Sequence, residues 1–329
     1  MLRNFWYIAC ASIKLGSTPA RVNVLDHQLV VFRDGRGQPC ALLDRCSHRG
    51  APLSLGRVVK GTVECRYHGW RYDRAGECIQ IPSLTEERRI PKGCTVPSFP
   101  CVEQDGYVWV WTGEGEPTTA PRRIEGFATG HWMQGMVEAK CSSLRAVEIN
   151  LDWCHPYFAH RWTHQQSYRI RLKGFRTGRY ETRATPNGMI VFSPPTKQDD
   201  APIPAEPGVK LTYELPDRVT VEFFQPFHMR AIMHFVPTGP NSCRMEYTRN
   251  RVVPVGRRVR WETKEPILFA QDRELLEGAQ PWYDQDDKFE RSVESDWSTL
   301  LVRQIVDAAA RGEWPPKALP QRRVISVRG

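Results

Sequence analysis

The chain has 329 residues and a formal net charge of +9, and 40% of its residues are hydrophobic. This length allows roughly two domains, and the composition excludes a disordered or fibrous protein. No run of apolar residues approaches the length of a membrane-spanning helix, and the basic residues do not form a nucleic-acid-binding arm. The basic excess fits either a solvated surface or a docking face for an acidic redox protein.

The start of the chain lacks the pattern of a secretory signal. Without an export signal, the ten cysteines indicate reduced thiols, some of them metal ligands, and not a disulfide scaffold. We therefore expect a cytoplasmic protein with no membrane and no nucleic-acid partner.

The first 112 residues predict short strands and turns. "RVNVLDHQLVVFRD" and "PCALLD" alternate around the turn "DGRGQP", and "GYVWVWTG" at 106–113 is a β-branched and aromatic strand. The following segment at 113–123, "GEGEPTTAPRR", is rich in glycine, proline and charge. We take it as a boundary between two domains, at 1–115 and 120–329.

The second domain is predicted to mix strands and helices. Helical patterns cover a stretch near 142–160 and the ranges 256–280 and 292–311, where "SVES" offers a capping box. Strand candidates lie at 131–140, 168–174, 179–185, 189–193, 218–225, 229–236 and 243–252. The fold class expected for the whole chain is therefore α+β.

Two Cys/His pairs in the first domain suggest a metal centre, Cys46-x-His48 and Cys65-x-x-His68. Structural zinc is one interpretation, because Cys₂His₂ is a common zinc ligand set. Zinc fingers, however, group cysteines on one arm and histidines on the other. One Cys and one His on each arm is what a two-iron cluster with mixed ligands requires.

Residues 44–76 resemble the Rieske [2Fe–2S] site of ring-hydroxylating oxygenases and related monooxygenases. The resemblance implies that Cys46 and Cys65 bind one iron and that His48 and His68 bind the other. It also implies an all-β Rieske domain at the N-terminus.

A second candidate metal site lies in "EINLDWCHPYFAHRW" at 148–162. His155 and His160 are about 140° apart on a regular helix and cannot chelate one ion from it. Pro156 disfavours helical geometry at His155, so we expect a break there. Two His and a carboxylate form the facial triad of non-haem iron oxygenases. Asp152-x-x-His155-x₄-His160 also resembles the iron-binding pattern of the Rieske oxygenases, although Asn150 lies closer to Asp152 than in that family.

The third iron ligand is expected among the late carboxylates, which are Asp272, Glu274, Glu277, Asp284, Asp286, Asp287 and Asp296. A helical stripe of Leu268, Leu275, Leu276 and Ala279 includes Asp272, whereas Glu274 and Glu277 point away. A carboxylate on a buried face is costly unless it is paired or bound to metal. "FAQDRELLEGAQ" further resembles the C-terminal helix of vanillate O-demethylase- and dicamba monooxygenase-type Rieske monooxygenases, which implies Asp272 as the ligand.

The resemblance extends over nearly the whole chain and carries further expectations. It implies a helix-grip catalytic domain, an antiparallel sheet around a long helix, and a head-to-tail homotrimer. Asp152 would bridge His155 to His68 of the neighbouring subunit. An NAD(P)H-dependent reductase or ferredoxin would load the Rieske cluster, and O₂ would react at the mononuclear Fe(II).

The expected reaction is hydroxylation or O- or N-demethylation of a small aromatic or heterocyclic organic substrate. Asn150, Phe158 and Trp282 are expected to line the substrate pocket. Two alternatives stay open at this point. One is a Rieske dihydroxylating dioxygenase. The other is an electron-transfer Rieske protein that has no catalytic iron.

Overall fold

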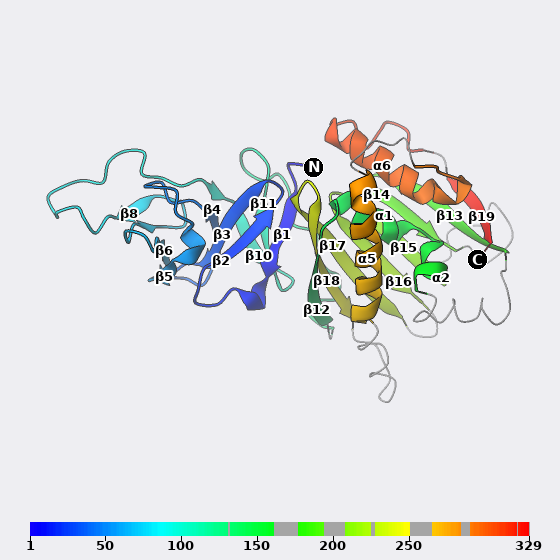
Figure 1. Ribbon diagram of the computed structural model, residues 1–329, viewed down its shortest axis with the longest axis horizontal. Helices are drawn as coiled ribbons and strands as arrows, with labels where there is room; N and C mark the ends of the chain where they lie inside the picture. Colours follow the sequence, from blue (N-terminus) through cyan, green and yellow to red (C-terminus); the bar gives the residue numbers. More distant parts are fainter. Residues whose placement is uncertain are drawn as a thin grey trace, which may run out of the picture. The chain divides into compact units, whose positions relative to one another are not determined.

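The computed structural model describes residues 1–130, 132–160, 177–193, 208–224, 228–250, 265–283, 290–320 and 322–328. The chain divides into two units, Arg3–Ala128 and Thr129–Gly329 together with Met1–Leu2 (Figure 1). The division falls after the segment at 113–123 because that segment is hydrogen-bonded to the first unit. Its contacts are Trp6 Nε1 to Thr119 O at 2.6 Å and Gln104 Nε2 to Pro121 O at 3.0 Å.

The first unit consists of three small antiparallel sheets. One sheet has the order β1-β11-β10, the second β2-β3-β4-β9 and the third β5-β6-β7-β8. The strands are β1 (Trp6–Ala11), β2 (Ala20–Val24), β3 (His27–Arg33), β4 (Pro39–Leu43), β5 (Arg57–Val59), β6 (Thr62–Glu64), β7 (Arg71–Tyr72), β8 (Cys78–Gln80), β9 (Ser98–Phe99), β10 (Cys101–Gln104) and β11 (Tyr107–Trp111), with short 3-10 turns at Ser12–Lys14 and Leu53–Leu55.

A single apolar cluster supports the end of this unit that carries the Cys/His pairs. Val30 and Phe32 of β3, Leu42 of β4 and Val63 of β6 are fully buried in it. The same cluster includes the predicted ligands Cys46 and Cys65, among others. Side chains buried on neighbouring sheets therefore anchor the two loops that carry these cysteines.

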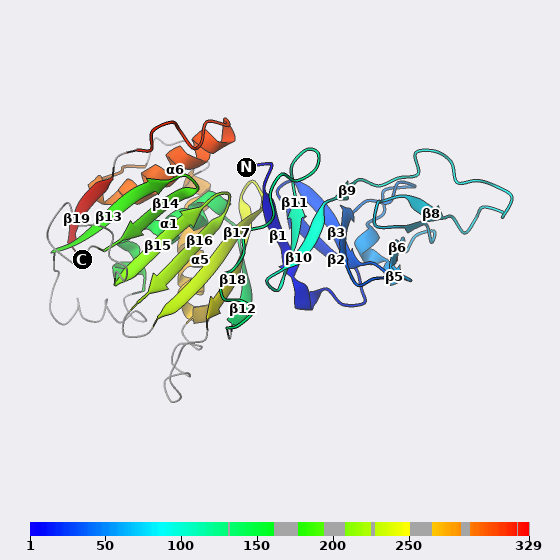
Figure 2. The ribbon, with the colours of Figure 1, turned by 180° about the vertical axis from the view of Figure 1, so that it is seen from behind.

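The second unit is built on one eight-stranded antiparallel sheet with the order β12-β18-β17-β16-β15-β14-β13-β19 (Figure 2). Its strands are β12 (Trp132–Ala139), β13 (Thr177–Thr185), β14 (Gly188–Phe192), β15 (Val209–Glu214), β16 (Arg218–Phe223), β17 (Met229–Gly239), β18 (Ser242–Asn250) and β19 (Arg323–Arg328). From β13 to β18 each strand pairs with the next in the chain, so the sheet is a meander.

Helices cover one face of this sheet (Figures 1 and 2). They are α1 (Ser143–Leu151), α2 (His155–Ala159), α5 (Glu265–Tyr283) and α6 (Trp297–Ala310), with a 3-10 turn at Glu294–Asp296 before α6. Helix α1 packs against β16, β17 and α6, and α5 packs against β12 and α1. The predicted α+β fold is thus confirmed. No helix in the described part of the chain is long and apolar enough to cross a membrane.

The two faces of the sheet differ in polarity, as expected for a sheet covered on one side. The helix side carries residues such as Val221, Met233 and Phe235. The opposite face carries ion pairs, including Arg230 with Glu222 at 2.8 Å and Arg244 with Glu246 at 2.9 Å. This alternation places apolar side chains toward the helices, where a cavity forms.

Several local expectations are confirmed and others are corrected. The predicted break near Pro156 is present, because α1 ends at Leu151 and α2 begins at His155. Strands β15 and β19 were missed, although "VKLTYE" and "RVISVR" have strand-like compositions. The capping contact before α6 comes from Asp296, whose carboxylate accepts from Val293 N at 2.8 Å. The strand expected at 168–174 and the helix start at 256–264 lie outside the described residues.

Candidate metal centres

Two loops with the same turn carry the predicted cluster ligands. Cys46 follows β4 and Cys65 follows β6. In each loop the cysteine carbonyl accepts a hydrogen bond from a glycine four residues later, Gly50 and Gly69, both at 2.9 Å. These glycines have φ of +73° and +71°, a conformation that costs other residues energy. The glycines let the main chain of each loop reverse direction, so that a Cys and a His project from the same turn.

The four predicted cluster ligands lie at two different depths below the protein surface. The Cys46 and Cys65 side chains are each 2% exposed, whereas His48 and His68 lie at the surface with ring centroids 4.7 Å apart. Trp70 stacks on His48 at 4.5 Å with nearly parallel planes. An inner pair of sulfurs and an outer pair of nitrogens matches a two-iron cluster, which holds each pair on a different iron. The residues therefore fit the cluster that the sequence predicted.

Tyr72 also contacts one of the predicted cluster ligands, although its sequence context did not indicate this. Its hydroxyl lies 3.1 Å from Cys46 Sγ and 3.0 Å from Ser47 Oγ. Burial, followed by the Cys46 contact, raises the pKa of the Tyr72 phenol, and burial also raises the pKa of the Cys65 thiol. The phenol therefore keeps its proton and can donate it to a thiolate once a metal has deprotonated Cys46.

Replacing Tyr72 by Phe is expected to lower the reduction potential of the cluster. A hydrogen bond to a ligand sulfur stabilises the reduced cluster, which carries more negative charge. Loss of about 1 kcal/mol corresponds to roughly 40 mV for one electron. Protein-film voltammetry of Tyr72→Phe measures the shift, and Tyr67→Phe, an exposed ring beside His68, is the control. An unchanged potential in Tyr72→Phe would show that the contact does not tune the cluster.

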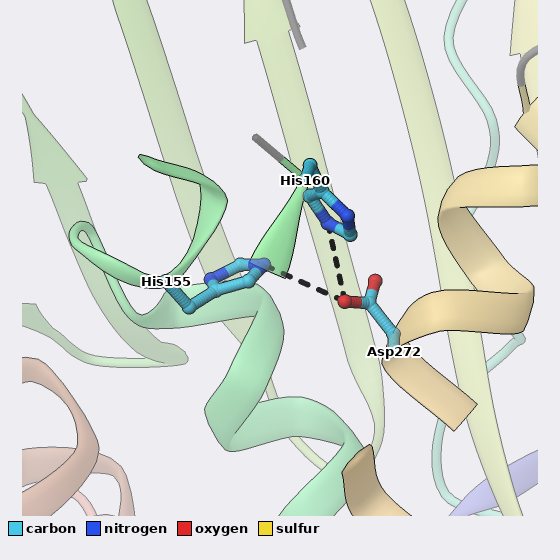
Figure 3. A group of neighbouring side chains, drawn as sticks. All are labelled: His155, His160 and Asp272. Atoms are coloured by element: carbon cyan, nitrogen blue, oxygen red, sulfur yellow. Dashed lines mark ion pairs between the residues drawn. The ribbon is translucent and has the colours of Figure 1, made fainter. Parts of the chain in front are cut away.

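The second site brings together three side chains that are far apart in the sequence. His155 begins α2, His160 follows the end of α2, and Asp272 lies in the middle of α5. Asp272 Oδ1 is 3.1 Å from His160 Nε2 and 3.8 Å from His155 Nε2 (Figure 3). One ligand atom from each of the three residues lies within 4.8 Å of the others. Two imidazoles and a carboxylate thus converge on one point, leaving the remaining directions open.

The outer nitrogen of each imidazole is held by an oxygen atom. His155 Nδ1 lies 2.9 Å from the main-chain oxygen of Asp152, and His160 Nδ1 lies 2.9 Å from Gln271 Oε1. A carbonyl oxygen can only accept, so each Nδ1 carries the proton and donates it. Each Nε2 then directs a lone pair at Asp272. Such contacts set the tautomer and direction of metal-binding histidines.

The surroundings of the Asp272 carboxylate show whether a cation fits between the three residues. Asp272 Oδ1 is buried and accepts no hydrogen bond from the described residues. A buried oxygen facing two imidazole lone pairs is repelled unless a positive charge lies between them. A metal ion supplies that charge, and the three residues therefore fit one.

A proton competes with the metal for the same position. Burial opposes protonation of His160. Once protonated, however, the ring can donate a hydrogen bond to the negatively charged Asp272 carboxylate, and this effect, together with Gln271, outweighs burial and raises the pKa of His160. Burial lowers the pKa of His155 and outweighs the opposing effect of Asp272. Metal binding is thus expected to weaken as the pH falls and His160 gains its proton.

The structure corrects the contact expected between Asp152 and His155. Asp152 Oδ1 accepts from the main-chain N–H groups of Cys154 at 2.7 Å and His155 at 3.2 Å. The carboxylate therefore caps the start of α2, while the main-chain oxygen of Asp152 orients the imidazole. No described residue donates a hydrogen bond to the second carboxylate oxygen, Oδ2.

A cavity of about 410 Å³ opens beside the three residues. Asn150, His155, His160 and Asp272 all contribute to its lining. Much of the remaining lining is apolar and comes from the sheet, including Leu211, Val221, Phe223, Met229, Ala231 and Met233. The volume suits a small organic molecule.

Two of the predicted pocket residues do not line this cavity. Phe158 is 58% exposed and Trp282 is 62% exposed. Trp282 follows Asp272 by about 15 Å of helix, which carries it past the cavity. Closeness in sequence to the metal ligands therefore did not predict which residues line the cavity, because most of the lining comes from the sheet.

The orientation of α5 also differs from the expected apolar stripe. Leu275 is 52% exposed. Glu277 Oε1 accepts from Lys140 N at 2.9 Å, and Gln280 Oε1 accepts from Ser142 N at 2.8 Å. The inner side of α5 is thus partly polar, because its end caps the chain that enters α1. Asp272 still faces inward.

Replacing Gln271 by Leu is expected to weaken metal binding at this site roughly 10- to 100-fold. The change removes the acceptor that orients His160, although the ligand atoms themselves stay. Iron titration of the metal-depleted protein measures the affinity, and Glu274→Leu, an exposed position on the same helix, is the matched control. Equal affinities in Gln271→Leu and the parent would show that His160 does not depend on Gln271.

Comparisons with known proteins agree with this geometry. Residues 5–100 match the Rieske [2Fe-2S] domain family. The chain is 34% identical over 178 residues to the oxygenase component of dicamba O-demethylase from Stenotrophomonas maltophilia, covering 52% of this chain and 51% of that protein. It is 38% identical over 174 residues to chloroplastic chlorophyllide a oxygenase from Chlamydomonas reinhardtii, covering 51% and 26%. The chain thus spans about half, or less, of the length of these relatives.

Two solved structures have the same fold over almost the full length. Dicamba monooxygenase bound to 3,6-dichlorosalicylic acid superimposes with a TM-score of 0.78 at 20% identity, covering 95% of this chain and 98% of that one. NdmA of Pseudomonas putida CBB5 with caffeine gives a TM-score of 0.78 at 20% identity, covering 97% of both chains.

The first unit is therefore a Rieske [2Fe–2S] domain. The resemblance to Rieske non-haem iron oxygenases that the motifs predicted is confirmed, and the chain has the fold of their oxygenase components.

Proposed function

We propose that this protein is the terminal oxygenase of a Rieske system that hydroxylates or demethylates a small organic substrate. The observation that carries the proposal is the convergence of His155, His160 and Asp272 on one point beside an apolar cavity. A protein that only transferred electrons would need neither these three converging side chains nor the cavity. When bound, the Rieske cluster supplies single electrons and a mononuclear iron supplies the centre for dioxygen chemistry.

The chain's own residues would prepare this chemistry in three ways. Asp152 O and Gln271 hold the two imidazoles so that both Nε2 atoms aim at the same point. Asp272 contributes the negative charge that balances a divalent cation. The apolar wall of the sheet excludes water and positions the substrate beside the ligands.

Iron analysis separates this proposal from an electron-transfer protein. The oxygenase is expected to contain about three irons per chain, and a simple Rieske carrier about two. Anaerobically purified protein, analysed for iron and sulfide, decides between them. Brown protein with a Rieske-type EPR signal is expected. Stoichiometric zinc in a colourless protein would overturn the assignment of the first site.

Turnover under ¹⁸O₂ separates the proposal from a dihydroxylating dioxygenase. A monooxygenase or demethylase transfers one labelled atom to its substrate or to the leaving group, whereas a dioxygenase transfers both to the product. A surrogate reductase with a substrate library, followed by oxygen uptake, would first identify a substrate. The reductase or ferredoxin partner is part of the same proposal, as is the head-to-tail homotrimer.

In the proposed trimer Asp152 links the two metal sites across a subunit boundary. Its Oδ1 caps α2, and its Oδ2 accepts no hydrogen bond from the described residues of its own chain. The second oxygen is thus available to accept a hydrogen bond from His68 of a neighbouring copy, whose imidazole is exposed. This contact would couple the Rieske cluster of one subunit to the iron of the next.

Asp152→Asn is expected to leave both metal sites filled while slowing electron transfer between them on the order of 10²-fold or more. The Asn oxygen can still cap α2, so the helix should remain. The measurement is a single turnover, in which the reduced cluster is mixed with substrate and O₂ and its reoxidation is followed. Reoxidation at the parent rate would mean that Asp152 is only a helix cap.

A further inference from the structure

Two cysteines that neither metal centre uses lie in contact within the second unit. Cys141 follows β12 and precedes α1, and Cys243 lies in β18 opposite Ala139 of β12. Their sulfur atoms are 3.9 Å apart, close enough for one S–H to donate to the other sulfur. Both side chains are buried, with exposed fractions of 0% and 2%. The fold thus holds two free thiols against each other below the surface.

Helix α5 holds the main chain on both sides of Cys141. Glu277 Oε1 accepts a hydrogen bond from Lys140 N at 2.9 Å, and Gln280 Oε1 accepts one from Ser142 N at 2.8 Å. The same helix carries the carboxylate of the second metal centre. A displacement of Cys141 therefore strains the two contacts that fix α5 against the start of α1.

A small void lies beside both the thiol pair and the second metal centre. Its volume is about 30 Å³, and Cys243 and Asp272 both line it. Asn150, Phe269 and Asp272 border this void and also line the main cavity. A space of this volume admits a molecule of about the size of water or hydrogen peroxide. The thiol pair is therefore within reach of a small oxidant from the cavity.

We propose that Cys141 and Cys243 are a peroxide-sensitive redox pair, which closes to a disulfide and thereby loosens α5. The inference rests on the proposed oxygenase function, because hydrogen peroxide is the two-electron reduction product of O₂, the expected co-substrate. Peroxide oxidises one thiol to a sulfenic acid and releases one water molecule. The other sulfur then attacks the sulfenic sulfur, so that an S–S bond forms and a second water leaves. Two thiols and one peroxide thus give one disulfide and two waters.

The geometry of the pair suits a reversible disulfide. The hydrogen bond from Cys243 lowers the pKa of the Cys141 thiol and outweighs burial, and the thiolate is the form that reacts with an oxidant. Bond formation brings the sulfurs closer by roughly 2 Å. Part of this movement falls on the main chain at Cys141, because Cys243 is fixed in a strand between β12 and β17. A disulfide that strains its surroundings is easily reduced again.

The test compares the reduced full-length protein with protein treated with one equivalent of peroxide, which catalase then removes. Mass spectrometry of unreduced peptides should find Cys141 linked to Cys243, and dithiothreitol should reverse the link. Hydrogen exchange of the Lys140 and Ser142 amides should be roughly ten-fold faster in the linked protein. Anaerobic iron titration of the metal-depleted second centre should show an affinity lower by roughly five-fold or more, the effect of losing one such hydrogen bond.

Cys243→Ser and Cys141→Ser each remove one sulfur at little change in size. Either variant should bind iron within about three-fold of the reduced parent and should not respond to peroxide. Cys154→Ser is the matched control, because Cys154 directly precedes the candidate ligand His155, and burial raises the pKa of its thiol to about 11. It should respond to peroxide as the parent does.

The proposal is overturned if no linked peptide forms or if the linked protein keeps the amide exchange of the reduced protein. It is also overturned if the serine variants of the pair still lose iron affinity with peroxide, or if Cys154→Ser abolishes the response. Thermal midpoints show whether each variant is folded.

Disulfide formation and amide exchange are read without turnover and without iron, so their outcome is separate from that of the oxygenase proposal. A linked peptide with faster exchange in a protein of about two irons per chain would retain the redox pair and reject the oxygenase. About three irons per chain without a linked peptide would do the reverse.

Discussion

Asp272→Ala is expected to lose the mononuclear iron while the Rieske EPR signal remains at parent intensity. The change removes the only carboxylate among the three converging side chains, so the remaining imidazoles would hold a divalent ion weakly. Turnover should fall roughly 10³-fold or more, since the metal is worth several kcal/mol to the reaction. Iron analysis, EPR and oxygen uptake on the same sample measure the three quantities.

The control for Asp272→Ala has to be chosen from the structure. Glu277 looked suitable from helical periodicity, but it accepts the main-chain N–H of Lys140, so Glu277→Ala should cost about 1 kcal/mol of stability. Glu274 is exposed on the same helix, and Glu274→Ala should be silent. An Asp272→Ala protein with the full iron content and the parent rate would assign the ligand to another carboxylate.

Cys65→Ser is expected to abolish the Rieske cluster and to destabilise the first unit by several kcal/mol. Serine is close in size to cysteine, so the substitution itself disturbs the packing little. The loss arises because the cluster ties together the loops that follow β4 and β6, and metal-binding energy is also folding energy. Visible absorption, iron content and thermal unfolding measure it.

Cys78→Ser is the matched control for Cys65→Ser. Cys78 is buried in the same apolar cluster as Cys46 and Cys65, and its thiol contacts the main-chain oxygen of Gln80. It should keep the cluster and lose little stability. If both serine variants lost the cluster equally, the effect would come from packing and not from ligation.

The first metal centre could be predicted from sequence because its determinants are local. Each loop contains one Cys, one His and one glycine within five residues, and the turn that joins them needs no distant partner. The second centre was harder, because α5 meets α2 only in the folded chain. Pro156 showed locally where the helix breaks. Asp272 was selected by a stripe that included Leu275, which is in fact exposed.

The surroundings of the second metal centre could not be predicted from the sequence, because they arise from tertiary contacts. Gln271 orients His160 across more than a hundred residues of sequence, and no local pattern marks it. Phe158 and Trp282 were expected in the pocket because they are aromatic and near the ligands, yet they lie outside its lining. Arg249 also lines the cavity, but the sequence alone did not indicate this, because strand alternation assigns a face only when the sheet register is known.

By itself the sequence determined the α+β class, the Cys/His loops of the Rieske domain and the residues able to form an iron site. These follow from short-range spacing, glycine and proline conformations, and the donor atoms of the side chains. Only the tertiary structure decided the tautomers of the imidazoles, the cavity wall and the positions of the charged residues that line the cavity. Those features arise where strands in register and helices from distant segments meet, and burial there sets which polar groups must be paired.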